Sequence, residues 1–228
     1  MAPWLGGRHG LATSIAMTDA FAEELFQEAF HLMSTSSGGE GLARAAKTMR
    51  RSADLGHAAA ANNVGAMAQY GRGMPEDLSL ARAYYEQAAA AGLPAGQFNL
   101  GFMWLHGLGG DRDLARARVL FEAAAGGGDT DALTHLGRMA ILGEGGEKDG
   151  AAGQAYWRQG ADLGDSRCAF NLGVSLAGGH AGEPDFVAAY AWFKRAHALG
   201  NREAASRMKT LEAVMHAEEL EAAHRLSL

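Results

Sequence analysis

Residues 93–128 read LPAGQFNLGFMWLHGLGGDRDLARARVLFEAAAGGG, and this stretch decides the fold. Apolar residues recur three and four positions apart on either side of a glycine-rich turn, which predicts short helices at residues 94–106 and 114–126. Asp113 precedes the second helix, where its carboxylate can accept an unpaired backbone N–H. Gly107 and Gly128 follow the two helices, where a left-handed backbone favours glycine. The stretch is therefore a helical hairpin.

The glycines and one aspartate of this hairpin recur every 36 residues. The glycine columns are Gly56, Gly92, Gly128, Gly164 and Gly200; Gly65, Gly101, Gly137 and Gly173; Gly71, Gly107, Gly143 and Gly179; and Gly73, Gly109 and Gly145. The aspartate column is Asp77, Asp113, Asp149 and Asp185. A fixed period over so many columns is typical of an array of stacked hairpins.

The Gly65 column differs from the others because it lies inside the first helix of each hairpin. A glycine there costs about 0.5–1 kcal/mol relative to alanine, so its repetition requires a packing reason. We expect the two helices of each hairpin to approach too closely for a Cβ. The small residues at Ala88-Ala89, Ala124-Ala125 and Gly160-Ala161 are the expected facing positions.

These hairpins resemble the Sel-one-like repeat family, a branch of the tetratricopeptide-like superfamily. The resemblance rests on Leu100-Gly101, Trp104, Gly107, Gly109, Asp113, Ala117, Leu120-Phe121, Ala124-Ala125 and Gly128, and on their equivalents in the other units. It implies an all-α, right-handed superhelical αα-repeat solenoid with repeats at 57–92, 93–128, 129–164 and 165–200.

The ends of the chain depart from the repeat, as the ends of repeat arrays usually do. Residues 17–56 are predicted to be a helix pair that forms a degenerate capping repeat, with an amphipathic helix at 19–33. Residues 201–228 are predicted to be a C-terminal capping helix. Residues 1–16 contain Pro3 and several glycines, so we expect a disordered or non-native extension, with Met17 as the hypothetical start.

Composition limits the classes of partner. The chain has 20 Lys and Arg against 26 Asp and Glu, a net charge of −6, which disfavours a nucleic-acid partner. No apolar run approaches the roughly 20 residues that span a bilayer, and the N-terminal stretch is too broken for a secretion signal. We therefore expect a cytoplasmic protein that does not insert into membranes.

Catalytic and metal motifs are weak in this sequence. Ser206-Arg-Met-Lys209 matches the S-x-x-K of serine β-lactamases, but the chain has neither S-D-N nor K-T-G. Disulfide-rich relatives are described as weak β-lactam hydrolases, yet their paired cysteines are missing here. Cys168 lies in a small-residue column and is predicted to be a buried, inert thiol. We expect no enzyme activity, cofactor or metal; β-lactamase-like hydrolysis is the alternative.

One column carries chemistry that suits a ligand. Asn63, Asn99, His135 and Asn171 share one place on the first helices, and we call them the amide column. The resemblance implies that first helices line a concave groove, where such amides hold a bound peptide backbone. The neighbours expected on this face are Asn62, Tyr70, Phe98, Phe102, His106, Thr134, Arg138 and Phe170. The alternative is a structural role, in which these amides form hydrogen bonds with the backbone of the neighbouring hairpin.

The predicted function is a non-catalytic protein-interaction scaffold or adaptor that binds a peptide or a partner helix in the concave groove. A further alternative is a regulatory subunit that self-associates through its N-terminal helix, whose apolar residues include Phe21, Phe26 and Phe30. The expected state is a monomer or a weak homo-oligomer with a protein or peptide partner.

Overall fold

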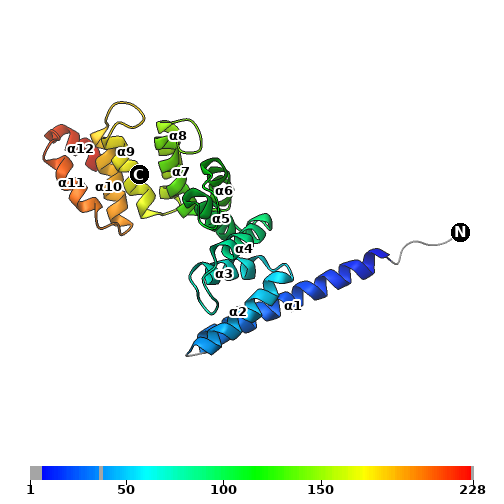
Figure 1. Ribbon diagram of the computed structural model, residues 1–228. Helices are drawn as coiled ribbons and strands as arrows, with labels where there is room; N and C mark the ends of the chain where they lie inside the picture. Colours follow the sequence, from blue (N-terminus) through cyan, green and yellow to red (C-terminus); the bar gives the residue numbers. More distant parts are fainter. Residues whose placement is uncertain (1–6, 36–37, 227–228) are drawn as a thin grey trace. The chain divides into compact units, whose positions relative to one another are not determined.

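The computed structural model describes residues 7–35 and 38–226, and these residues form helices and turns without a strand (Figure 1). The helices are α1 Gly7–Thr35, α2 Gly39–Asp54, α3 Ala58–Gln69, α4 Leu78–Ala90, α5 Pro94–His106, α6 Leu114–Gly126, α7 Thr130–Leu142, α8 Gly150–Asp162, α9 Ser166–Ala177, α10 Phe186–Ala198, α11 Ala204–Glu212 and α12 Ala217–Arg225. The predicted helices at 94–106 and 114–126 coincide with α5 and α6. The fold class, an all-α repeat solenoid, is confirmed, while its superhelical twist stays a prediction.

The chain divides into two compact units, residues 1–112 and 113–228. The first unit contains α1 to α5, and the second contains α6 to α12. The division falls in the turn between α5 and α6, inside one repeat.

Helix α1 is longer than the sequence predicts, because it begins at Gly7 rather than near Asp19. Isolated glycines in a helix cost only about 1 kcal/mol each, which the surrounding helix-forming residues offset here. Helix α2 packs along the C-terminal part of α1, where the Ser52 hydroxyl donates to the Ala22 carbonyl at 2.6 Å. The N-terminal part of α1 extends past the end of α2 (Figure 1). Residues 1–6 of the predicted extension lie outside the described residues.

The predicted aspartate caps are confirmed. Each of the four aspartates accepts a hydrogen bond from the backbone N–H three residues later, at the start of α4, α6, α8 or α10. The oxygen–nitrogen distances are 2.9 Å for Asp77, 3.0 Å for Asp113, 2.9 Å for Asp149 and 2.8 Å for Asp185. A second helix therefore begins at the same place in every repeat.

The glycines inside the first helices face an aromatic ring of the second helix. A Cβ on Gly65 would lie 2.7 Å from the Tyr85 ring, and a Cβ on Gly173 would lie 2.8 Å from the Phe193 ring. Gly137 faces the Trp157 indole in the same way. The expected close approach is confirmed, but the expected facing residues are wrong: large rings, not small side chains, occupy the space.

The small residues instead serve the contact between successive repeats. A Cβ on Gly96 of α5 would lie 2.5 Å from the Cβ of Ala88 on α4. Gly160 of α8 is in equally close contact with Cys168 of α9. Small side chains at these places let the second helix of one repeat pack tightly on the first helix of the next.

The C-terminal segment forms two helices, α11 and α12, where the sequence predicts one. The break precedes α12, whose Glu219 carboxylate accepts from the His216 backbone N–H at 2.8 Å. Tyr190 of α10 donates to Glu212 at 2.8 Å, and its ring meets the His224 ring edge-on at 5.3 Å. Both terminal helices are thus attached to α10.

Candidate functional site

The twelve predicted site residues lie on first helices or directly after one, and none is fully buried. Seven of them lie in the first unit and five in the second, and we treat these two groups as two faces. The α3–α5 face comprises Asn62, Asn63, Tyr70, Phe98, Asn99, Phe102 and His106. The α7–α9 face comprises Thr134, His135, Arg138, Phe170 and Asn171.

On the α3–α5 face, one amide of the column is engaged within the protein. The Asn99 side-chain amide donates to the side-chain oxygen Oδ1 of Asn62 at 2.8 Å, which joins two successive first helices. Asn63 is half-buried, and within the described part of the chain its side chain makes no hydrogen bond. The column therefore contains both a structural amide and an uncommitted one.

Aromatic side chains follow one another along α5 beside these amides. The ring centroids of Phe98 and Phe102 are 6.4 Å apart, and those of Phe102 and His106 are 4.3 Å apart. Tyr70, just beyond the end of α3, is 67% exposed. Partly exposed aromatic groups next to polar ones are common where proteins bind one another.

The α7–α9 face has a different set of contacts. The Thr134 hydroxyl lies 3.2 Å from the Cys168 sulfur, and the His135 ring stacks on Phe121 of α6 at 5.0 Å. Arg138 forms an ion pair with Glu144 at 2.9 Å. Asn171 is half-buried, and its side chain makes no hydrogen bond with the residues that the structure describes.

Charged and polar groups near the start of α9 are held in place. Arg167 pairs with Asp165 at 2.7 Å and also with Asp131 of α7. Burial opposes the charged form of Asp165, but hydrogen bonds from Arg167 and the Cys168 N–H hold the pKa of this carboxyl below its usual value. Cys168 is fully buried, as predicted, and burial raises the pKa of its thiol to about 11.

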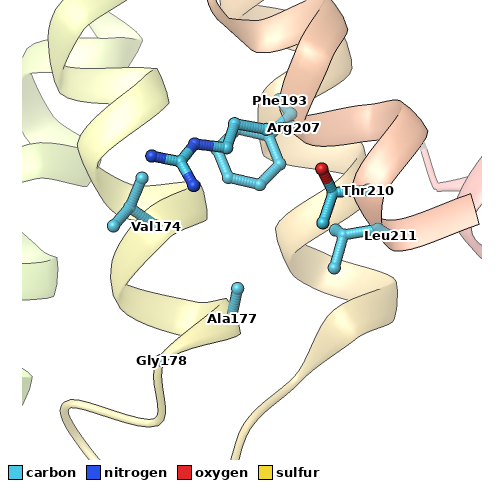
Figure 2. Close-up of a pocket in the computed structure, with 7 residues that line it drawn as sticks. All are labelled: Val174, Ala177, Gly178, Phe193, Arg207, Thr210 and Leu211. Atoms are coloured by element: carbon cyan, nitrogen blue, oxygen red, sulfur yellow. The ribbon is translucent and has the colours of Figure 1, made fainter. Parts of the chain in front are cut away.

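A pocket between α9, α10 and α11 was not predicted from the sequence. It has a volume of about 240 Å³ and is lined by Val174, Ala177, Gly178, Phe193, Arg207, Thr210 and Leu211 (Figure 2). Arg207 stands 36 residues after Asn171, so extending the amide column by one period would have found it. The prediction stopped at Asn171 because the Leu-Gly pair is replaced by Met208-Lys209 one residue later.

The motifs associated with other chemistry lie on exposed helix surfaces. Ser206 and Lys209 are both exposed on α11. Among the described residues, no group of three His, Cys, Asp or Glu side chains could hold a metal ion. Helices of the described chain also lack the combination of length and apolar character that crossing a membrane requires.

Comparison with known families gives a direct match to this architecture. The Sel1 repeat model matches residues 58–93, 94–129, 130–165 and 166–201. The chain belongs to the Sel1 repeat family. Each Sel1 repeat begins one residue later than the unit predicted from the glycine period, and the number of units is the same.

Solved structures show the same fold. A protective antigen of uropathogenic Escherichia coli with an SLR fold is similar at 25% identity and a TM-score of 0.78, over 90% of this chain and 44% of that one. A Sel1 repeat protein from Oxalobacter formigenes is similar at 25% identity and a TM-score of 0.74, over 88% and 84%. An immunity protein of Pseudomonas aeruginosa shares the fold at 18% identity and a TM-score of 0.51, over 90% and 83%.

No curated protein matches the sequence significantly. This chain spans less than half the length of the E. coli antigen. What the family and the fold together suggest is a protein-interaction scaffold, without a particular partner.

Proposed function

We propose that this Sel1 repeat protein is a non-catalytic adaptor that binds a segment of a partner protein on its first-helix faces. The observation that supports this proposal best is that the side-chain amides of Asn63 and Asn171 have no partner among the described residues. The two residues hold the same place in their repeats, are partly exposed, and have amide groups that form no hydrogen bond with other described residues.

The chemistry of these amides suits an extended peptide. One side-chain amide can donate to a backbone carbonyl and accept from a backbone N–H of the same peptide residue. Phe102 and His106 lie on α5, the first helix of the repeat after Asn63, and Phe170 precedes Asn171 on α9. The amides would fix the path of the peptide, and the aromatic rings would contact its side chains.

Asn99 gives an internal comparison, because its amide is already bonded to Asn62. In the proposed function, Asn63 and Asn171 bind the partner, whereas Asn99 mainly joins two repeats. Substituting each amide therefore separates the binding role from the structural role within one column.

The test begins with a random-peptide library displayed on phage and selected against the purified protein. The affinity of a selected peptide is then measured for the wild type and for Asn63→Ala, Asn171→Ala and Gln159→Ala, the last being an exposed amide on α8. Asn63→Ala or Asn171→Ala removes a side-chain amide that would bond the peptide backbone. Each variant should therefore bind the peptide about tenfold more weakly. Gln159→Ala should bind as the wild type does. Selected peptides that bind all three variants equally would contradict the proposal.

A second candidate function rests on helix α1. Met17 is 70% exposed and Phe21 is 46% exposed on α1. Exposed apolar residues one turn apart can mediate self-association. Sedimentation of the wild type and of a Met17→Glu, Phe21→Glu double variant tests this: only a wild-type dimer that the variant loses supports it.

A further inference from the structure

The pocket in the second unit has an apolar interior and one cationic group. Helix α9 contributes Val174 and Ala177, α10 contributes Phe193, and α11 contributes Arg207, Thr210 and Leu211, while Gly178 follows α9. In Figure 2 the Arg207 guanidinium lies on the Val174 side of the pocket, and Ala177 and Leu211 point into the pocket. The volume of about 240 Å³ exceeds the roughly 150 Å³ that suffices for a benzene ring, so one large apolar side chain fits.

The charge of Arg207 is not compensated within the described chain. Its side chain is exposed and takes part in no ion pair or hydrogen bond with a described residue. The Glu212 carboxylate on the same helix accepts from Tyr190 instead. By contrast, Arg138 pairs with Glu144, and Arg195 pairs with Asp162 at 3.2 Å. A free guanidinium beside an apolar pocket favours a ligand with a carboxylate next to an apolar group.

Position in the repeat connects this pocket to the proposed peptide-binding face. Arg207 follows Asn171 by 36 residues, and Thr210 follows Val174 by the same interval. A peptide that continues from Asn171 to the next first helix would therefore reach Arg207.

We propose that this pocket is the specificity site for the partner: it takes one Leu- or Phe-sized side chain, and Arg207 binds the carboxylate of an adjacent Asp or Glu. The partner is thus a protein with an internal segment that pairs an acidic residue with a large apolar one. The inference rests on the proposed function and adds the chemistry of the bound sequence.

The probe is the capped hexapeptide acetyl-Ala-Ala-Asp-Phe-Ala-Ala-amide, titrated into full-length, nitrogen-15-labelled protein and followed by NMR. We expect saturable shifts at the amides of residues 174–178 and 207–211. Replacing the peptide's Asp by Asn, or its Phe by Ala, should weaken binding about tenfold. Arg207→Gln should cause the same loss, Arg207→Lys a smaller one, and Lys209→Gln, an exposed charge on the same helix, none.

A second variant tests the pocket without removing the charge. Thr210→Leu places a larger side chain at an exposed position that lines the pocket, and it should abolish the shifts while the helical circular dichroism is unchanged. Absence of saturable binding at millimolar peptide, or equal affinity of wild type and Arg207→Gln, overturns the proposal. If a library-selected peptide then still depends on Asn63 or Asn171, the pocket proposal alone has failed. If no selected peptide depends on them, the proposed function has failed.

Discussion

The interior of the helical hairpins is far more alike from one repeat to the next than the first-helix faces are. In the interior, Gly65, Gly137 and Gly173 each face an aromatic ring, contributed by Tyr85, Trp157 and Phe193. On the faces, the amide column places Asn99 in an inter-repeat hydrogen bond, leaves Asn63 and Asn171 uncommitted, and has a histidine stacked on Phe121.

The physical cause of this difference is space. A methyl group added to a packed interior must displace its neighbours, so substitutions there are costly. Most surface substitutions change stability by less than about 0.5 kcal/mol, so face positions are free to vary. The interior therefore maintains the fold, while the residues of the faces are free to differ from one repeat to the next.

The largest expected effect is at an interior glycine. In Gly173→Ala the new Cβ would lie 2.8 Å from the Phe193 ring and 3.2 Å from the Ala189 carbonyl. Overpacking of this kind predicts a loss of about 1–3 kcal/mol in the free energy of unfolding, measured in urea. The control is Gly126→Ala at the end of α6, where a Cβ meets nothing within 4 Å and no loss is expected. Equal stability of both variants would show that the rings impose no constraint.

The buried thiol is expected to make stability depend on alkaline pH. Burial raises the pKa of Cys168 to about 11, whereas the unfolded chain's thiol ionises at a lower pH. The unfolded state therefore loses protons first, and the free energy of unfolding should fall between about pH 9 and pH 11, by up to about 2 kcal/mol. The difference in stability between wild type and Cys168→Ala should change over this range and stay constant below pH 8. A constant difference throughout would contradict the buried, neutral thiol.

Removal of a helix cap should have an intermediate effect. Asp149→Ala leaves the Ala152 N–H without its acceptor at 2.9 Å, which predicts a loss of about 1 kcal/mol. Glu147→Ala, an exposed change in the same turn, should leave the melting temperature unchanged. The repeat predicts a similar loss for Asp113→Ala and Asp185→Ala, and a loss confined to one repeat would show that the aspartate caps are not equivalent.

The smallest expected effects are on the faces. Asn99→Ala removes the hydrogen bond to Asn62 and should lower stability by about 0.5–1 kcal/mol. Asn63→Ala should stay within about 0.5 kcal/mol of the wild type. Thermal unfolding of both variants measures this difference. If both variants lose comparable stability, Asn63 has a structural role like that of Asn99.

The sequence predicts those features that depend on local geometry. Helix ends at Asp113 and Gly107 follow from hydrogen-bonding capacity and from a left-handed backbone, and both agree with the structure, in which Gly107 has a φ of 67°. The glycine period marks where a Cβ is excluded, but it does not tell what lies opposite. Small residues such as Ala88-Ala89 are therefore predicted opposite Gly65, where the structure has the Tyr85 ring.

The part of the site that the sequence did not predict depends on contacts between residues far apart in the chain. The residues next to Asn99 and Asn63 in the sequence do not distinguish the two amides. Asn99 differs because it bonds the Asn62 side chain, which lies on a different helix, α3. Arg207 follows the period, but its place beside an apolar pocket depends on how α9, α10 and α11 pack together.

The pairing of three interior glycines with a ring of their own repeat has a consequence for how this array can change length. Gly65 and Tyr85 belong to one repeat, as do Gly137 with Trp157 and Gly173 with Phe193. No glycine takes its ring from a neighbouring repeat in these pairs. Duplication or deletion of a whole 36-residue unit would therefore leave each pair intact, whereas an insertion of another length would separate them. Evolution can in this way lengthen or shorten the array in whole repeats without redesigning the interior.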